Sequence, residues 1–202
     1  TEGRAAHGSR WQDGIDANLR MGRVLARLEA LGAALVASDP HPVVGPPSLH
    51  AAMVQGGTGW STYAARCVLR VERRTVPGET EAQVVGQIQA ILDDLAAADP
   101  TFRATVRPVL TRPAWEARPG SAIADVVGRA AEGVLGRAPE RSGAPYWMDT
   151  ALLGEAGIDT IVFGPLGEGA HAAVEWVDLE SVRQVAEVLA RTAVEFCERV
   201  KG

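Results

Sequence analysis

A glycine-rich loop with one histidine behind it stands out near the end of the chain. The loop runs from Gly164 to Gly169, and His171 and Glu175 follow it. It comes directly after the apolar run 160–163, which predicts a short buried strand. A histidine at such a place can bind a metal or act as a general base, with the carboxylate four residues on orienting its ring. A solvated histidine in a surface loop is the alternative interpretation.

Two other polar side chains stand beside predicted turns or helix ends. His7, in the segment 3–9, is predicted from the residues alone to be a histidine at the end of a strand, near a turn. Asp149 precedes a helical pattern, so the residues alone predict a helix N-cap. The aromatic pair before it, Tyr146 and Trp147, either packs in the core or lines a substrate pocket.

The middle of the chain carries a candidate contact for an anion. Arg74 follows Glu72 on an alternating pattern and precedes the turn residues Pro77 and Gly78. A guanidinium group can hold a substrate carboxylate by a bidentate contact. The alternative is a local ion pair with Glu72 on an exposed strand face, which contributes little to stability.

These motifs, in this order, resemble the M20 family of zinc-dependent peptidases and deacylases. The resemblance covers essentially the whole chain. It rests on five segments: 163–177 around His171, 146–150 around Asp149, 72–79 around Arg74, the Gly-Gly-Thr at 56–58, and 3–9 around His7.

The resemblance implies a metal and substrate site in the later part of the chain. His171 is expected to bind one zinc of a two-metal site, in which cobalt or manganese can replace zinc. Gly164 and Gly167 are expected to offer backbone N–H groups to a substrate carboxylate, and Asp149 to orient the active-site shell.

The earlier part of the chain resembles the lid, or dimerisation, domain of the same family. The resemblance implies that His7 reaches the active site of a partner subunit and stabilises the oxyanion there, in a homodimer formed through this domain. Arg74 is expected to hold the substrate carboxylate. Ser61 stands where many members have an asparagine that contacts substrate, so its substrate-binding role departs from the family pattern.

The resemblance is incomplete in one respect. The catalytic half of the family begins with a His-x-Asp motif and later carries a Glu-Glu pair, and neither is found among the 202 residues. A catalytic zinc site needs about three protein ligands and an open position. We therefore expect the chain to be the later part of a longer protein, an expectation that the missing initiator methionine also favours.

The expected activity of that longer protein is hydrolysis of an amide bond. The substrate would be an N-acyl amino acid or a small peptide with a free carboxylate. A catalytically incomplete dimerisation or ligand-binding module without metal is the alternative. A different α/β hydrolase that uses His171 as a base is disfavoured, because the chain has no Gly-x-Ser-x-Gly motif.

Composition narrows the function classes further. A net charge of −5 argues against a nucleic-acid-binding protein, which would carry a basic surface. Cys67 and Cys197 lie far apart in apolar patterns and predict two reduced, buried thiols. No membrane-spanning run or signal peptide is recognisable, so we expect a cytoplasmic protein.

The elements that must position these residues form an α/β protein in two domains. Residues 1–112 predict an α+β lid of strand, helix, strand, strand, helix, strand, with two helices on a small antiparallel sheet. Its strands are expected at the chain start, 49–54, 64–75 and 102–110. Its helices are expected after Asp13 and from Thr80.

Residues 113–202 predict the C-terminal portion of an α/β catalytic domain. A helix spans Ile123 to Val134 and is closed by Gly136, and a second helix starts near Asp149. The last helix starts near Asp178, with an apolar stripe of Val182, Val185, Leu189, Phe196 and Val200.

Overall fold

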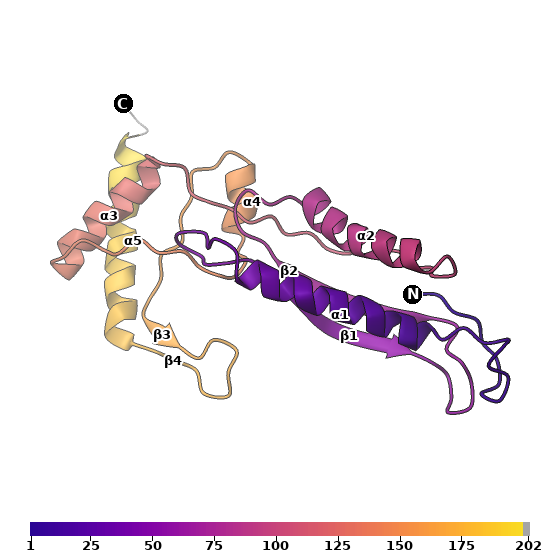
Figure 1. Ribbon diagram of the computed structural model, residues 1–202. Helices are drawn as coiled ribbons and strands as arrows, with labels where there is room; N and C mark the ends of the chain where they lie inside the picture. Colours follow the sequence, from indigo (N-terminus) through magenta and orange to yellow (C-terminus); the bar gives the residue numbers. More distant parts are fainter. Residues whose placement is uncertain (200–202) are drawn as a thin grey trace. The chain divides into compact units, whose positions relative to one another are not determined.

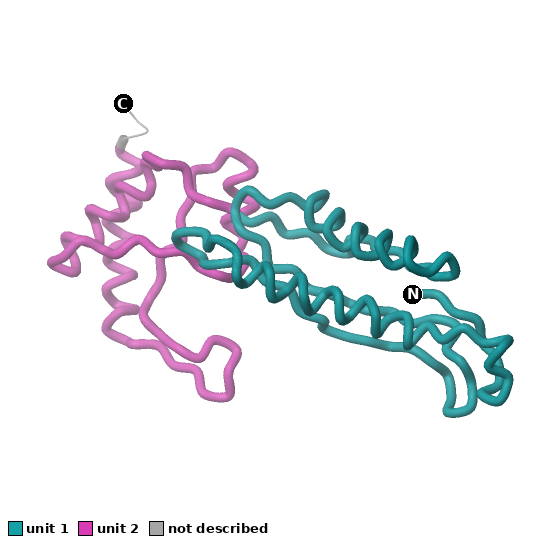
Figure 2. The backbone as a smooth tube through the Cα atoms, viewed as in Figure 1, with its two compact units in different colours: residues 1–114 teal, residues 115–202 magenta. Residues whose placement is uncertain are grey.

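The computed structural model describes residues 1–199, which fall into two compact units, Thr1–Ala114 and Trp115–Gly202 (Figures 1 and 2). The sequence placed the boundary between the two domains after residue 112, and the structure places it after residue 114. Among the described residues, no helix is long and apolar enough to cross a membrane.

Unit 1 contains α1 (Ala17–Val36), β1 (Ser48–Gly56), β2 (Cys67–Arg74) and α2 (Glu81–Ala98). Unit 2 contains α3 (Ala122–Leu135), α4 (Thr150–Glu155), β3 (Gly167–Glu168), β4 (Trp176–Val177) and α5 (Leu179–Arg199). In both units the described strands form two-stranded antiparallel sheets. The expected mixture of helices and small antiparallel sheet is confirmed.

Both helices of unit 1 share one core with the β1–β2 hairpin, and Figure 1 shows α1 running along that hairpin. The buried side chains of this core are Ala17, Met21, Val24, Leu28, Ala64, Cys67, Ile91, Leu92 and Phe102. Each large apolar side chain buried here stabilises the fold by roughly 1.5–3 kcal/mol. The core holds the hairpin flat against the helices, so the two ends of β2 have fixed positions.

The alternation predicted for β2 is confirmed. Cys67, Leu69 and Val71 belong to the unit 1 core, while Arg70 and Arg74 on the other face are exposed. Successive side chains of a strand point to opposite faces, so this pattern follows from the sequence alone. The prediction of two buried thiols was right for Cys67 and wrong for Cys197, which is exposed.

The start of α1 differs from the prediction. Asp16, rather than Asp13, caps the helix, because its side chain accepts hydrogen bonds from the N–H groups of Asn18 (2.8 Å) and Leu19 (3.3 Å). The helix therefore starts later than expected. Leu19 falls on the outer face and is 73% exposed.

Two predicted strands at the margins of unit 1 are absent from the described sheet. The first residues make isolated bridges. Among the described residues, one backbone hydrogen bond joins them to the segment 102–110, from the Glu2 N–H to the Arg103 carbonyl (2.9 Å). Phe102 is nevertheless buried, with Ala104 and Val106 packed against the core. The apolar side chains of these segments pack against the core, as their alternation suggests. A β-strand also needs a ladder of backbone hydrogen bonds to a neighbouring strand, and these segments lack one within the described sheet.

Unit 2 packs α3 against α5. Val127, Ala130 and Ala131 of α3 meet Val188 of α5 in a second buried cluster. The prediction of α3 is confirmed, because Ser121 caps its start and Gly136 ends it with φ of 69°. A left-handed residue after a helix is usually glycine, since glycine has no Cβ to clash.

The apolar run 160–163 is not a strand in the structure, so that prediction was wrong. Ile161 and Phe163 pack against the α3–α5 cluster. Within the described residues no neighbouring strand pairs with the run, and an apolar run without such a neighbour stays an extended loop.

Asp159 ties this run to the start of α3. Its carboxylate accepts hydrogen bonds from the Ser121 hydroxyl (2.8 Å) and the Ile123 N–H (3.3 Å). The Ser121 hydroxyl holds the pKa of the Asp159 carboxyl below its usual value, because both contacts favour the charged form.

The last helix starts where the sequence placed it, but its buried face is rotated. Val188 is fully buried and Val185 half-buried, whereas Val182 and Leu189 are exposed. Successive residues of a helix point about 100° apart, so predicted apolar positions that are off by one residue, such as Leu189 beside Val188, face solvent. Val200, also in the predicted stripe, lies outside the described residues.

Candidate functional site

His7 lies at one end of unit 1, where the segments 6–8 and 61–63 pair in antiparallel fashion. His7 stands directly opposite Thr62. Two backbone hydrogen bonds flank this pair: Tyr63 N–H to the Ala6 carbonyl (2.9 Å) and Gly8 N–H to the Ser61 carbonyl (2.7 Å). We call the two segments together the His7 tip.

The His7 ring is exposed, and its two nitrogens differ. Nδ1 accepts a hydrogen bond from the Ser9 N–H (3.2 Å) and lies 2.9 Å from the Ser9 hydroxyl. A nitrogen that accepts an N–H cannot carry the proton of a neutral imidazole, so that proton is on Nε2. His7 can therefore present an Nε2–H donor to a ligand.

Ser61 belongs to the His7 tip, one residue before Thr62. Its carbonyl holds the Gly8 N–H, and its exposed hydroxyl has no protein partner among the described residues. The Tyr63 ring closes over Gly14, where an added Cβ would come within 2.5 Å of a ring carbon. A side chain at residue 14 would push this ring away, so glycine there keeps the His7 tip compact.

Arg74 lies at the far end of β2, in a small charged cluster. Its Nε donates to Glu72 (2.7 Å), and the other Glu72 oxygen lies 3.4 Å from His50 Nε2. The local pair considered as the alternative for Arg74 is therefore present. No motif in the sequence pointed to His50, which lies on β1 and faces Glu72 through the strand register.

Arg73 points to the opposite, inner face and fixes the turn after β2. Its side chain is 5% exposed and pairs with Glu79, whose second oxygen accepts the Val76 N–H (2.9 Å). This clamp anchors the backbone next to Arg74. Burial explains why the charge needs a partner there.

The structure does not bring His7 and Arg74 together within one chain. His7 pairs with Thr62, before the start of β2, whereas Arg74 is the last residue of that strand. Eight residues of strand at about 3.3 Å each separate their ends by more than about 20 Å. One small ligand cannot touch both residues of the same chain.

His171 occupies the tip of the β3–β4 hairpin in unit 2. The Ala172 N–H bonds the Gly169 carbonyl (2.8 Å), which closes a tight turn with His171 at its third position. Its φ of 64° makes it the one described residue other than glycine with a positive φ. This conformation is strained for histidine and is found mostly where structure or function requires it.

The glycines of this hairpin are needed for close approach of the two backbones. A Cβ on Gly169 would lie 2.0 Å from the Val174 carbonyl oxygen, and one on Gly167 would lie 2.5 Å from that of Trp176. The Asp178 N–H bonds the Leu166 carbonyl (2.9 Å), so the Gly167–Val177 pair is of the non-hydrogen-bonded type. The Gly167 N–H therefore points away from β4 and is available to a ligand.

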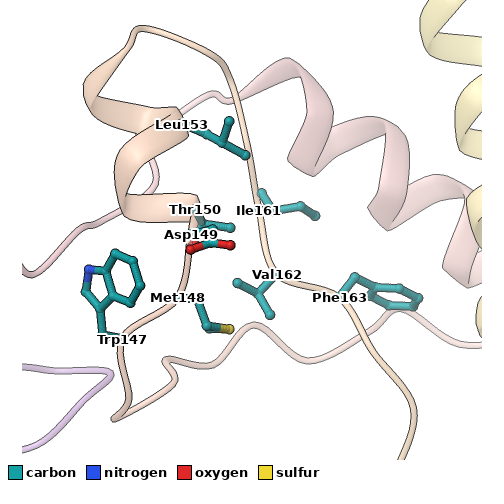
Figure 3. A pocket seen from close by; sticks show the side chains of 8 residues that line it. All are labelled: Trp147, Met148, Asp149, Thr150, Leu153, Ile161, Val162 and Phe163. Atoms are coloured by element: carbon teal, nitrogen blue, oxygen red, sulfur yellow. The ribbon is translucent and has the colours of Figure 1, made fainter.

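A cavity of about 530 Å³ lies beside α4 and the run 160–163 (Figure 3). Its lining residues are Trp147, Met148, Asp149, Thr150, Leu153, Ile161, Val162 and Phe163. Asp149 stands at the N-cap of α4, but its side chain makes no capping hydrogen bond there. Its carboxylate is thus free to face the cavity, as Figure 3 shows.

The remaining predicted residues of unit 2 are not part of this cavity. His171, Gly164 and Gly167 are absent from its lining, and among the described residues no three His, Cys, Asp or Glu side chains cluster as metal ligands would. His171 offers one ligand. The described residues therefore do not fit a complete metal site.

Comparison with known proteins gives this geometry a context. Residues 1–100 match the family model of the M20-type peptidase dimerisation domain. The chain is 31% identical over 199 residues to acetylornithine deacetylase of Myxococcus xanthus, covering 96% of this chain and 50% of that protein. It is 24% identical over 205 residues to a pyrimidine deformylase of Bacillus subtilis (N-formyl-4-amino-5-aminomethyl-2-methylpyrimidine deformylase), covering 93% and 48%.

Solved structures agree on the fold. A tripeptidase from Staphylococcus aureus superposes with a TM-score of 0.74 at 18% identity, covering 95% of this chain and 48% of that one. The aminobenzoyl-glutamate utilization protein of Klebsiella pneumoniae has a TM-score of 0.56 at 29% identity, covering 96% and 46%. The chain thus spans about half the length of the relatives it matches.

Proposed function

Since residues 1–100 are an M20 peptidase dimerisation domain and the chain is homologous to M20 peptidases and deacetylases, we propose that it is the lid and C-terminal part of a metal-dependent amidohydrolase. The substrate would be an N-acyl amino acid or small peptide with a free carboxylate. The observation that carries the proposal furthest is the hydrogen bond from the Ser9 N–H to Nδ1 of the exposed His7 ring, which favours a proton on Nε2.

In this reaction water adds to the amide carbonyl carbon, the C–N bond breaks, and the amine leaves with a proton. Negative charge develops on the carbonyl oxygen. A hydrogen bond from an N–H donor to that oxygen stabilises the transition state more than the bound substrate, so His7 would raise kcat. The described residues do not complete a metal site, so no step through a metal is assigned to this chain.

We propose that two copies build each active site. His7 and Arg74 lie too far apart in one chain to hold one small substrate, but His7 of one copy and Arg74 of its partner can do so in a symmetric dimer. Within the described residues β1 pairs with β2 alone, which leaves its other edge open. Met53 and Val54 on β1 are half-exposed, as expected of a strand that pairs with a second copy.

Mixing two inactive variants tests this arrangement. His7→Ala and Arg74→Ala should each lower kcat/KM strongly in the full-length protein. After unfolding and refolding together, random pairing should restore about a quarter of wild-type activity, because half the dimers are mixed and each mixed dimer has one intact site. Mixtures no more active than the separate variants would refute the shared site.

Metal content and turnover test the reaction itself. The full-length protein should hydrolyse some member of a panel of N-acyl amino acids and dipeptides when loaded with zinc, cobalt or manganese. His171→Ala should lose bound metal, measured by elemental mass spectrometry, together with activity. His41→Ala is the matched control and should retain both.

The second candidate is a dimerisation or ligand-binding module without catalysis. The lack of a complete ligand cluster among the described residues favours it. It predicts a dimer that hydrolyses no member of the panel with any of the three metals. Metal-dependent turnover that His171→Ala abolishes would exclude it.

A further inference from the structure

The pairing at the His7 tip decides which side chain accompanies His7. The two flanking hydrogen bonds join the residue before His7 to the residue after Thr62, and the residue after His7 to the residue before Thr62. This is the pattern of a non-hydrogen-bonded antiparallel pair, in which the two opposed side chains share one face with Cβ atoms about 4.5–5.5 Å apart. Thr62 is thus the nearest cross-strand neighbour of the His7 ring.

Ser61 does not share that face. Ser61 lies in the turn before Thr62 and takes part in the pairing through its carbonyl, which accepts the Gly8 N–H. Next to an opposed pair, the adjacent residue is expected to point to the other face. Sequence resemblance aligns Ser61 with a substrate-contacting asparagine. The strand register instead puts Thr62 beside His7.

The Thr62 hydroxyl is available for a ligand. Thr62 is exposed, and within the described part of the chain its hydroxyl has no hydrogen-bond partner. The His7 ring is tied back through Nδ1, so its Nε2–H and the Thr62 hydroxyl form a pair of unused polar groups on one face. Because opposed Cβ atoms lie only about 4.5–5.5 Å apart, one small ligand can reach both groups.

We infer that Thr62, rather than Ser61, is the substrate-binding hydroxyl of the His7 tip. It donates to a substrate oxygen next to the carbonyl oxygen that His7 holds. This inference rests on the proposed function, because it needs a substrate that His7 already contacts.

Replacing Thr62 by valine, which removes the hydroxyl but keeps the shape of the side chain, tests this inference. In the full-length protein, Thr62→Val should lower kcat/KM about tenfold, the usual effect of one lost hydrogen bond to a ligand. Thr62→Ser should keep most of the activity. Thr105→Val, an exposed threonine elsewhere in unit 1, is the matched control and should change nothing.

The two assignments make opposite predictions. If Ser61 is the binding residue, Ser61→Ala lowers kcat/KM and Thr62→Val does not, which would overturn the inference. A loss in Thr62→Val that Thr62→Ser shares would mark a structural role and overturn it as well. Non-additive losses in the His7→Ala, Thr62→Val double variant support a shared ligand.

Failure of the proposed function would look different. If the wild-type protein hydrolyses no substrate of the panel, the amidohydrolase proposal fails. If the wild type is active and His7→Ala is impaired while Thr62→Val equals wild type, only the assignment of Thr62 fails.

Discussion

At the scale of single residues, the two histidines of interest are held in opposite ways. His7 is relaxed, with one ring nitrogen tied to Ser9 and the other free. His171 is strained, because its positive φ would suit glycine better. Strained residues cluster at functional sites, so the conformation of His171 is consistent with its proposed role as a metal ligand.

Substitution of His171 should separate stability from function. The free energy of unfolding of His171→Gly should be about 1 kcal/mol higher than that of His171→Ala. Alanine in the left-handed conformation is strained, whereas glycine is not. Urea unfolding with a chelator present measures this without a contribution from metal. Equal stabilities of the two variants would argue against the strain, and neither variant should be active.

Asp99 is the described side chain with the clearest pKa shift. The Thr101 hydroxyl, the Thr101 N–H and Arg23 lower the pKa of its carboxyl from 3.8 to about 2. Because the folded pKa is depressed, the stabilisation is present above the unfolded value of 3.8 and is lost as pH falls toward 2.

An NMR titration of the aspartate carboxyl carbons should therefore find Asp99 still charged at pH 3. In Thr101→Val the Asp99 pKa should rise toward its usual value, since the largest of the three contributions is gone. A wild-type Asp99 titrating near 3.8 would contradict the hydrogen bonding seen at the end of α2.

At the scale of elements, caps and registers place the candidate residues. Thr80 starts α2 through a capping box with Gln83, which sets the turn after β2 beside Arg74. The β1–β2 register, with an irregularity between Ala51 and Met53, brings His50 opposite Glu72. Moving either strand by one residue would turn Arg74 into the core.

The cap of α1 by Asp16 can be tested against Asp13, which lies just before it. Asp16→Ala should lower the free energy of unfolding by about 1 kcal/mol, because two N–H groups at the helix start lose their acceptor. Asp13→Ala removes only an exposed ion pair with Arg10 and should change stability by less than about 0.5 kcal/mol. Denaturant unfolding decides between the two caps, and the reverse order would restore Asp13 as the cap.

At the scale of the whole molecule, unit 1, which matches a peptidase dimerisation domain, is the part proposed to join two copies, and unit 2 carries the candidate metal ligand. The open edge of β1 is where a second copy would add its own strand. Exposed strand edges associate unless charge or covering structure blocks them.

A charge on that edge should break the dimer. Met53→Lys should shift the full-length protein toward monomer in light scattering and lower its activity, because His7 then no longer meets Arg74 of a second copy. Val109→Lys adds the same charge at an exposed apolar site outside the hairpin and should leave the dimer intact. A Met53→Lys protein that stays dimeric would place the interface elsewhere.

The amino-acid sequence by itself determined the local features of this protein. Apolar alternation predicted the inner face of β2, Thr80 and Gly136 predicted helix ends, and the motif order led to the M20 family. These features depend on neighbours along the chain, so a single sequence carries them.

Only the tertiary structure decided which residues meet. It paired His7 with Thr62, set His50 against Glu72, separated His7 from Arg74, and left the run 160–163 unpaired. Strand pairing and helix phase depend on hydrogen bonds and packing between segments far apart in the chain, and one residue of register reverses a side chain's direction.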